Sequence, residues 1–293
     1  MKKLIFISGS GKSGSTLLDI IIGSQLNSFS IGELHNLFRP GLIENEYCTC
    51  GKIVNDCELW NEVIKRWRQN SLMNQKDYYK YQQFFRTNKN YKSLLRELKN
   101  PSDLFLTYLK DTKLLYNIIS EVSKCDVLID SSKSITRALI LNKIYSEDKL
   151  VIIHLLNKFS RVLNSNKKVV EKDLKIGREK STNKKGLEYV FYFLPRWLIP
   201  NLILYFQLRS QRKVIVFEEY IFNPNKVLEK IYNNSFTQMN EYIPKHLMAG
   251  NHMRMKKSIK IDKEILNKPL TNLNFVDRII GKIVDSIFYK FLK

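Results

Sequence analysis

Acidic residues are scarce in this chain. Its 293 residues include 28 Asp and Glu against 49 Lys and Arg, which gives a formal net charge of +21. Such a surplus predicts an anionic partner: a phosphate-rich cofactor, an acidic glycan, a nucleic acid or an anionic lipid surface. Lys, Asn, Ile and Tyr are all abundant, as in the product of an AT-rich coding sequence, so composition alone also explains part of the charge.

A secretory leader and a disulfide framework are both missing. Only four apolar residues, Leu4 to Ile7, follow the initial Met-Lys-Lys, which is too short for the apolar region of a signal peptide. Four cysteines without such a leader predict free thiols in a reducing compartment. We therefore expect a cytoplasmic protein.

Long uninterrupted apolar runs are also missing. The longest apolar stretch, Leu187 to Leu208, is broken by Pro195, Arg196 and Pro200, so it predicts a buried helical hairpin or a segment that dips into a surface rather than a membrane span. The tail after Pro269 is amphipathic, and we expect it to pack on the domain, with contact to an anionic membrane as the alternative. Its apolar helical face comprises Phe275, Val276, Ile279, Ile280, Ile283, Val284, Ile287 and Phe288.

What the sequence does contain is a glycine-rich loop near its start. The apolar run Leu4 to Ile7 has the length and branching of a buried strand, and an apolar helix is predicted from Thr16 onward. Between them lies Ser8-Gly9-Ser10-Gly11-Lys12-Ser13-Gly14-Ser15. A strand followed by a glycine loop and the N-terminus of a helix is an arrangement that binds phosphate, because backbone N–H groups point at the anion. Lys12 adds a positive charge to it.

Strands and helices alternate along the rest of the chain. This order predicts an α/β fold, a three-layer parallel sheet flanked by helices, with ligands at the carboxyl ends of the strands. We expect a single domain over residues 1–270 with a helical insertion at about 60–125, and a C-terminal helix over 271–293. The predicted strands are 4–7, 29–34, 126–130, 150–155 and 214–217.

Nucleotide triphosphatases offer one interpretation of the loop. Gly11-Lys12-Ser13 fills the second half of a Walker A motif, but the first glycine of that motif falls on Phe6. Asp130, at the end of an apolar strand, is similar in position to the aspartate that holds magnesium in these nucleotide triphosphatases. A nucleotide-dependent kinase is therefore one alternative function, and a non-catalytic basic module that binds membranes or nucleic acid is another, although no nucleic-acid reader motif is present and no nucleic acid is expected.

Lys12-Ser13-Gly14-Ser15-Thr16 resembles the 5′-phosphosulfate loop of sulfotransferases that use 3′-phosphoadenosine 5′-phosphosulfate (PAPS). Further segments are similar to motifs of that family and follow in its order. They are Ile31-Gly32-Glu33, Cys48-Thr49-Cys50-Gly51 with Cys57 and Trp60, Asp130-Ser131-Ser132-Lys133, Val151 to Leu155, Phe217 to Tyr220 with Asn223-Pro224, and His246 with Gly250-Asn251-His252-Met253-Arg254.

This resemblance implies transfer of a sulfuryl group from PAPS to an acceptor hydroxyl, with a carbohydrate or glycolipid as acceptor. Lys12 would stabilise the leaving oxygen, Glu33 would act as general base, and Lys133 would bind sulfuryl oxygens. No metal is expected in this chemistry. The donor would be bound by Gly11, Lys12, Ser13, Gly14, Ser15, Thr16, Asn157, Ser165, Phe217, Gly250, Asn251, Arg254 and Lys256.

One departure from the family pattern concerns the 3′-phosphate. Asn157 stands where the family has an arginine, while the serine eight residues later is kept as Ser165. An amide lacks the charge and the fork of a guanidinium, so Lys158 or Arg161 could reach the phosphate instead.

Two further groups have structural and functional interpretations. His154 lies in an apolar strand, which favours a hydrogen-bonded core histidine over a catalytic one. Cys48, Cys50 and Cys57 could bind zinc together with His35, but their spacing is not that of a standard finger and favours structural thiols.

Overall fold

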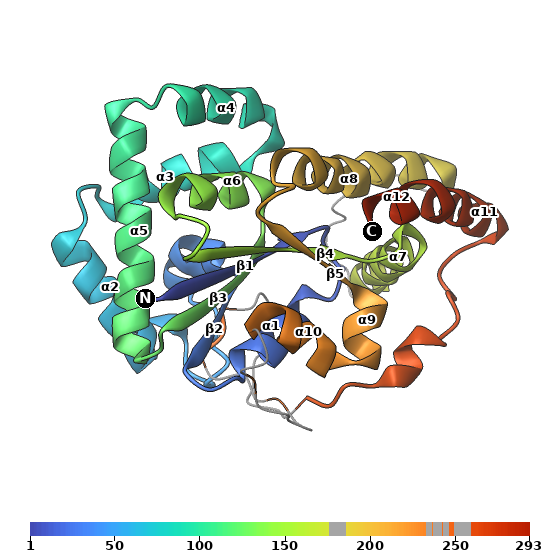
Figure 1. Cartoon of the computed structure of the whole chain (residues 1–293), viewed down its shortest axis with the longest axis horizontal. Helices are drawn as coiled ribbons and strands as arrows, with labels where there is room; N and C mark the ends of the chain where they lie inside the picture. The colour runs from blue at the N-terminus through green and yellow to red at the C-terminus, as the bar shows by residue number, and fades with distance from the viewer. Residues whose placement is uncertain (176–185, 233–235, 237–241, 243–245, 249–258) are drawn as a thin grey trace.

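A five-stranded parallel sheet forms the centre of the molecule. The computed structural model describes residues 1–175, 186–232, 236, 242, 246–248 and 259–293 (Figure 1). The sheet order is β2-β3-β1-β4-β5, and all its strand pairs are parallel. The strands are β1 (Lys3–Gly9), β2 (Ser28–Gly32), β3 (Val127–Lys133), β4 (Leu150–Leu156) and β5 (Arg212–Val216).

Alternate residues of β1 supply the cores on the two faces of the sheet. Leu4 and Phe6 are buried in one apolar cluster, whereas Ile5 and Ile7 belong to the other. A strand that is apolar on both faces needs helices on both, because successive side chains point to opposite sides. The three-layer α/β fold expected from the sequence is confirmed, and each of the five predicted strands is found.

Helices cover both faces of this sheet. One face carries α1 (Ser15–Gly23), α9 (Phe217–Phe222) and α10 (Pro224–Tyr232). The other carries α2 (Glu58–Asn70), α3 (Gln75–Arg86), α4 (Tyr91–Lys99), α5 (Asp103–Ser123), α6 (Ile135–Ile144) and α8 (Gly186–Gln207). A third cluster joins α8 to α7 (Phe159–Lys175), α11 (Phe275–Val284) and α12 (Lys290–Leu292). Helices α2 to α5 occupy the predicted insertion, whose status within a single domain stays a prediction.

The order in which strands are added to the sheet changes side between β1 and β4. From β1 it builds β2 and β3 on one side, and it then crosses to place β4 and β5 on the other. In open α/β sheets, ligands bind outside the carboxyl ends of the strands at such a switch point. The glycine loop follows β1 and Asn157 follows β4, so both lie at this position.

The predicted hairpin over 187–208 is wrong, because this stretch is a single 22-residue helix, α8. Its buried residues Val190, Trp197, Asn201 and Leu204 form one helical stripe that continues across both prolines. Burial along the whole stripe offsets the backbone hydrogen bonds that Pro195 and Pro200 cannot make. Among the described helices, none combines the length and apolar character needed to cross a bilayer.

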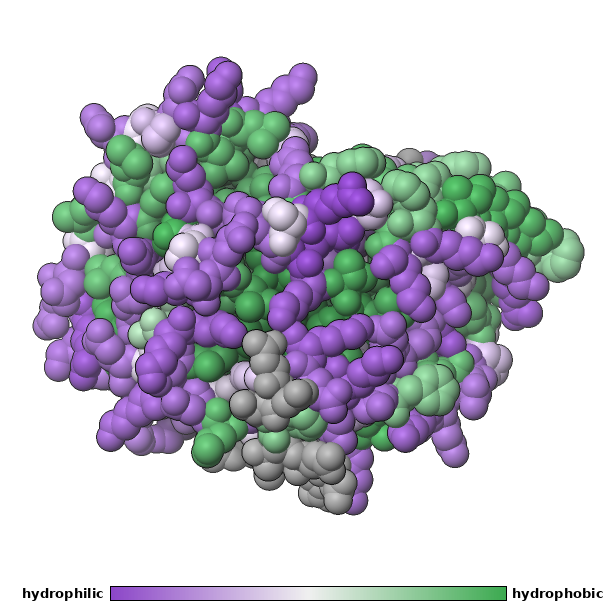
Figure 2. Space-filling view, in the orientation of Figure 1, coloured by the Kyte–Doolittle hydropathy of each residue, from purple (hydrophilic) through white to green (hydrophobic). Residues whose placement is uncertain are grey.

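The C-terminal helix packs on the domain only in part. Val284 is buried, but Phe275, Val276, Ile279, Ile283 and Ile287 are exposed. Figure 2 shows apolar side chains gathered over α8 and the C-terminal helices, at the upper right of the view. The expected packing therefore accounts for one side of this helix and leaves the other side uncovered.

Candidate active site

The glycine loop after β1 closes onto α1 through Gly14. This residue precedes α1 with φ 97° and ψ 12°, a left-handed conformation that favours glycine. A Cβ at Gly14 would lie 2.3 Å from the Tyr220 hydroxyl oxygen and 2.6 Å from the Phe217 ring. The Tyr220 hydroxyl donates a hydrogen bond to the Gly14 carbonyl at 2.9 Å. The start of α9 therefore holds the loop closed over the N-terminus of α1.

A cavity of about 600 Å³ opens beside this loop. It brings together five of the residues predicted to bind the donor, although they come from four separate parts of the chain. Its walls also carry four cationic side chains, and no carboxylate is present among the described residues that line it. The predicted residues in its lining are Lys12, Gly14, Asn157, Ser165 and Phe217, and the cations are Lys12, Arg161, Lys168 and Lys268.

Helix α7 supplies one side of the cavity through a single face. Arg161, Asn164, Ser165 and Lys168 line the cavity, and their spacing of three and four residues places them on one face of the helix. Sequence reasoning identified only Ser165 as a donor ligand and Arg161 as a candidate. The same helical spacing is the signal that would have added Asn164 and Lys168. Lys268 lies in a loop ahead of α11 and carries no such signal.

The two cations considered as replacements for the missing arginine differ in position. Lys158 pairs with Glu218 at 3.2 Å and does not line the cavity. Arg161 does line it, and its guanidinium also donates to the Ile265 carbonyl at 3.2 Å and to the Leu266 carbonyl. Arg161 therefore fixes the opposite wall of the cavity while it faces the space inside.

Two buried polar atoms near this cavity have no hydrogen-bond partner within the part of the chain that the structure describes. They are the Ser13 hydroxyl oxygen, between two residues that line the cavity, and the Asn157 side-chain oxygen. The Asn157 backbone is fixed, because the Trp197 indole N–H donates to its carbonyl at 3.2 Å. Buried polar groups without partners are costly and are therefore rare in proteins. A polar ligand in the cavity would remove this cost.

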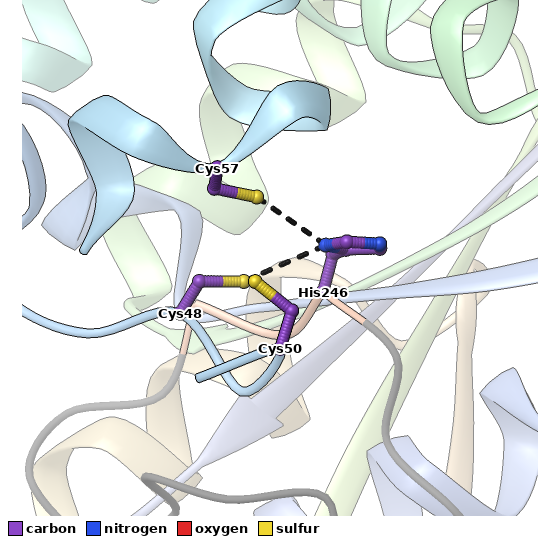
Figure 3. Close-up of side chains that lie close together, drawn as sticks. All are labelled: Cys48, Cys50, Cys57 and His246. Carbon is purple, nitrogen blue, oxygen red and sulfur yellow. Dashed lines mark hydrogen bonds between the residues drawn. The ribbon is translucent and has the colours of Figure 1, made fainter. Parts of the chain in front are cut away.

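The predicted cysteine and histidine residues do not assemble as expected. His35 lies beside Glu33, and its backbone N–H donates to the Ser132 hydroxyl at 3.3 Å. It is His246 that faces the sulfurs of Cys48, Cys50 and Cys57 (Figure 3). The pairing with His35 is therefore wrong, because the short helical turn Leu34–Asn36 after β2 places His35 beside Glu33 and Ser132.

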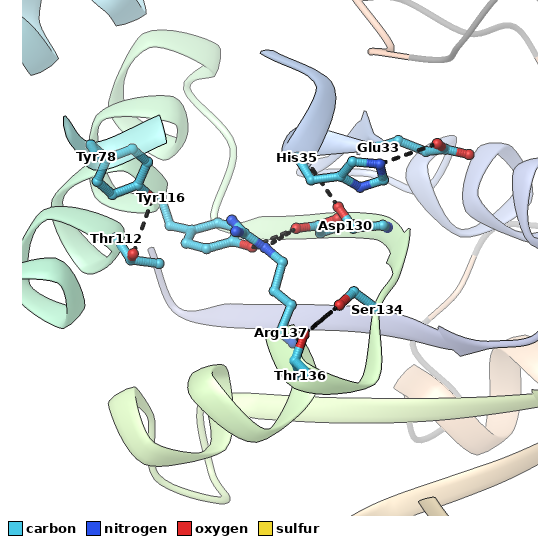
Figure 4. A network of polar contacts seen from close by, with 10 residues as sticks. Glu33, His35, Tyr78, Thr112, Tyr116, Asp130, Ser134, Thr136 and Arg137 are labelled. Carbon is cyan, nitrogen blue, oxygen red and sulfur yellow. Dashed lines mark hydrogen bonds and ion pairs between the residues drawn. The ribbon is translucent and has the colours of Figure 1, made fainter. Parts of the chain in front are cut away.

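Glu33 and Lys133 form an ion pair between neighbouring strand ends. Glu33 directly follows β2, and Lys133 ends β3 with a φ of 64°. The Lys133 carbonyl accepts a hydrogen bond from the Ser8 hydroxyl at 3.1 Å, and the Glu33 N–H donates to the Met248 carbonyl at 2.5 Å. Backbone contacts thus fix both ends of the pair. Glu33 also lies 3.8 Å from the His35 ring nitrogen (Figure 4).

Asp130 is not available for a metal ion. It is fully buried, its carboxylate accepts a hydrogen bond from the Ser132 N–H at 2.8 Å, and it lies 3.3 Å from the Arg137 guanidinium. The Tyr116 hydroxyl donates to the same carboxylate (Figure 4). Both of its oxygens are therefore engaged within the core. This arrangement removes the feature that made a magnesium-dependent kinase an alternative.

His154 is a core residue. Its Nε2 lies 2.8 Å from the Asn201 side-chain oxygen and its Nδ1 lies 2.5 Å from the Arg212 guanidinium. Burial lowers the pKa of His154 to about 4, so the ring is neutral near pH 7. A neutral ring with both nitrogens occupied fits the structural interpretation made from the sequence.

The remaining predicted residues are placed as follows. Gly11 lies in the loop and Ser15 and Thr16 begin α1, although none of the three lines the cavity. Glu33 and Lys133 do not line it either. The predicted donor ligands Gly250, Asn251, Arg254 and Lys256 lie outside the described residues.

Comparison with known proteins gives similarity at the level of structure. No protein-family profile matches the chain, and no curated protein matches it. The sulfotransferase domain from the curacin biosynthetic pathway is similar over 97% of this chain and 98% of its own length, with 16% identity and a TM-score of 0.47.

Two further solved structures are similar. One is the sulfotransferase domain of the Synechococcus PCC 7002 olefin synthase, with 16% identity, a TM-score of 0.44 and coverage of 97% of this chain and 94% of that one. The other is a Mycobacterium avium sulfotransferase, with 12% identity, a TM-score of 0.44 and coverage of 79% and 63%. All three structural neighbours are sulfotransferases or sulfotransferase domains.

Proposed function

We propose that this protein is a sulfotransferase that moves a sulfuryl group from PAPS to an acceptor hydroxyl. The observation that supports this most directly is the cavity beside Lys12. Its lining combines Lys12 and Gly14, the residue that precedes α1, with Asn157 and Ser165, and it carries four cationic side chains. PAPS carries phosphate at both its 5′ and 3′ positions, so it needs anion-binding groups at two ends.

The chain's own residues would divide the binding as follows. Backbone N–H groups at the start of α1 would face the 5′-phosphate, and Lys12 would stabilise negative charge on the oxygen that leaves the sulfuryl group. The 3′-phosphate would lie near Asn157, Ser165 and Arg161. The donor itself supplies the activated sulfuryl group. Because Arg161 brings a guanidinium into this part of the cavity, it can provide the charge that Asn157 lacks.

Glu33 is the proposed general base. An alcohol is a weak nucleophile until a nearby group accepts its proton. The Lys133 ammonium pairs with Glu33. We therefore propose that Lys133 orients the Glu33 carboxylate and also contacts the sulfuryl oxygens. In this role Lys133 acts partly through Glu33.

Ligand binding tests the proposal without knowledge of the acceptor. We expect adenosine 3′,5′-bisphosphate to raise the melting temperature and ATP with magnesium to have little effect. A ligand at 100 times its dissociation constant adds about 2.7 kcal/mol. With an unfolding entropy of about 2 cal/mol/K per residue, this corresponds to a shift of about 4 °C for 293 residues.

Matched nucleotides make this test specific. Adenosine 5′-monophosphate lacks only the 3′-phosphate, so a much smaller shift is expected with it. Arg161→Ala should remove most of the difference between the two nucleotides, whereas Lys158→Ala should preserve it. Stabilisation by ATP with magnesium alone would contradict the proposal.

The acceptor is proposed to be a carbohydrate or glycolipid, on the resemblance of the segment that carries Glu33. A separate hollow of about 650 Å³ lies between α3 and α5, in the predicted insertion. It shares no lining residue with the donor cavity, so it is not the place of transfer. Screening of glycan and glycolipid acceptors with labelled PAPS tests this part, and labelling of a non-carbohydrate alcohol alone would contradict it.

A further inference from the structure

We propose that Cys48, Cys50, Cys57 and His246 bind one zinc ion. The four ligand atoms all lie within 4.8 Å of one another. Three sulfurs and one imidazole nitrogen are a donor set that zinc prefers in tetrahedral sites. Figure 3 shows the His246 ring directed at the sulfurs, which come from a loop and from the start of α2.

The separations between ligand atoms fit a tetrahedral ion. Zinc binds sulfur at about 2.3 Å and imidazole nitrogen at about 2.0–2.1 Å, which places a sulfur and a nitrogen of one site about 3.6 Å apart. The Nδ1 atom of His246 lies 3.3 Å from the Cys57 sulfur and 3.7 Å from the Cys48 sulfur. All four cysteines of the chain are free thiols. Zinc binding would release the thiol protons and needs no oxidant.

The backbone around Cys48 and Cys50 is shaped as a tight turn. The Cys48 N–H donates to the Lys52 carbonyl at 2.9 Å and the Gly51 N–H donates to the Cys48 carbonyl at 3.0 Å. Gly51 has a φ of 93°, which a glycine adopts without strain. This turn brings two cysteines separated by one residue to the same side. Cys57 immediately precedes α2, where a helix N-terminus favours a thiolate.

Two hydrogen bonds hold the segment of His246 against the cysteine loop and α2. The Trp60 indole N–H donates to the His246 carbonyl at 3.1 Å, and the Leu247 N–H donates to the Thr49 hydroxyl at 2.9 Å. Trp60 and Thr49 are both fully buried. These contacts orient the ligands from outside the cluster, as supporting residues do in metal sites. The site is therefore built before any ion binds.

The proposed ion has a structural role. Four protein ligands leave a tetrahedral zinc without an open position, so the site is closed to substrate. The ion would connect the loop at 48–57 to a segment almost two hundred residues later in the sequence. That segment continues to Met248, which pairs with the end of β2 beside Glu33. This inference departs from the expectation of metal-free thiols, and it does not depend on the proposed function.

Metal analysis of the full-length protein tests the site directly. After purification under reducing conditions with zinc in the growth medium, we expect one zinc per chain by elemental mass spectrometry. Cobalt substitution should produce thiolate-to-metal charge-transfer absorption. Well under half an ion per chain, or a disulfide among the three cysteines in alkylated peptides, would overturn the proposal.

Variants with a matched control complete the test. Cys57→Ser and His246→Ala should each lose zinc and should no longer be destabilised by a chelator. Cys125→Ser changes the one cysteine outside the cluster, whose sulfur lies 3.4 Å from the Ser123 carbonyl, and it should keep both the zinc and the chelator effect. Retention of zinc by His246→Ala, or its loss from Cys125→Ser, contradicts the assigned ligands.

A different observation supports a second proposal: we infer that an exposed apolar face docks on an anionic membrane. This face is formed by α8 and the C-terminal helices, and Phe206 and Phe275 on it are 66% and 77% exposed. The Tyr205 and Phe291 rings lie 4.8 Å apart and join its two halves. Its members are Leu187, Phe191, Ile199, Phe206, Phe275, Val276, Ile279, Ile283, Ile287 and Phe291.

Fixed contacts keep this face directed outward. Asp285 accepts hydrogen bonds from the Phe159 N–H at 2.6 Å and the Ser160 hydroxyl at 2.5 Å, and Asp277 pairs with Lys167 at 2.5 Å. The C-terminal helix therefore cannot turn its apolar side inward without breaking these polar contacts.

The positive charge around the apolar face favours an anionic membrane as its partner. Exposed lysines at 282, 290 and 293 lie on the same helices, in a chain with a net charge of +21. A second copy of the face would bring further lysines of the same charge, whereas anionic headgroups would attract the lysines as the apolar side chains enter the interface.

Vesicle sedimentation tests this second proposal. We expect binding to phosphatidylcholine vesicles that contain phosphatidylserine, weaker binding to pure phosphatidylcholine, and loss of binding in Ile283→Asp and Phe206→Asp. Leu26→Asp is the control, since Leu26 is 88% exposed in the turn between α1 and β2. Absence of binding to anionic vesicles, an equal effect of Leu26→Asp, or a dimer that Ile283→Asp dissociates would each overturn it.

Discussion

Gly14→Ala is the sharpest test of how the glycine loop is built. An L-residue in the left-handed region costs roughly 1–2 kcal/mol, and Gly14 has a φ of 97°. The added Cβ would also lie 2.3 Å from the Tyr220 hydroxyl oxygen, so this hydroxyl must move and its hydrogen bond to the Gly14 carbonyl breaks. Loss of that bond adds about 1 kcal/mol. We expect a total loss of about 3 kcal/mol in the free energy of unfolding.

The control for this substitution is another glycine of the same loop. A Cβ at Gly11 would have no neighbour within 4 Å, so Gly11→Ala should change the free energy of unfolding by less than about 0.5 kcal/mol. Urea unfolding of both variants measures the difference. Equal stability of the two variants would refute the assignment of strain to Gly14.

A double variant separates the steric effect from the backbone strain. Tyr220→Phe removes the hydroxyl that the new Cβ would meet, so Gly14→Ala should cost less in that background by about 1 kcal/mol. The Phe217 ring, 2.6 Å from the same Cβ position, remains in place. Because Phe217 also lines the donor cavity, Gly14→Ala should weaken bisphosphate binding as well. Additive effects of the two substitutions would show that the hydroxyl does not limit the space at Gly14.

Three further predictions concern the proposed chemistry and the core. Lys12→Ala and Glu33→Gln should each remove most sulfuryl transfer with little change in urea midpoint; full activity in either removes that residue from the mechanism. Lys133→Met should lower kcat far more than it changes the dissociation constant for adenosine 3′,5′-bisphosphate, since Glu33 loses its cationic partner, and equal losses in both contradict that role. Burial raises the pKa of Asp19 to about 7, above its unfolded value of about 3.9. The native state therefore keeps a proton that the unfolded state loses, so stability falls by on the order of 4 kcal/mol as pH rises from 4 to 7; Asp19→Asn should remove this slope in urea titrations.

The sequence was sufficient to predict the sheet and the strand ends at which the cavity beside Lys12 opens. Strands β1 and β4 are short apolar runs that stop at a glycine and before an asparagine, so Gly9 and Asn157 mark their ends. Since all the strands are parallel, these ends had to meet on one edge of the sheet. Local pattern and topology together were therefore enough to bring Lys12 and Asn157 to one cavity.

Tertiary contacts explain the two features that the sequence pattern did not predict, the continuous helix α8 and the position of His246. Proline usually ends a helix, which is why Pro195 suggested a hairpin, but burial of Trp197 and Leu204 along one stripe keeps α8 continuous. His35 is nearer to the cysteines in sequence than His246, but contacts of residues 246–248 with β2, Thr49 and Trp60 bring the later histidine to them. Such long-range pairing leaves no signal in the spacing of the residues.

The zinc cluster and the proposed base are connected through one short segment. His246 is one of the four proposed zinc ligands, and two residues later the Met248 carbonyl accepts a hydrogen bond from the Glu33 N–H at 2.5 Å. None of the described residues that line the donor cavity belongs to 246–248. Loss of the ion should therefore change the position of Glu33 more than the position of Lys12. A chelated protein is expected to lose more than tenfold in kcat, which corresponds to about 1.4 kcal/mol of barrier, while its dissociation constant for adenosine 3′,5′-bisphosphate changes much less. Equal losses in both would mean that the ion supports the whole edge of the sheet rather than the position of Glu33.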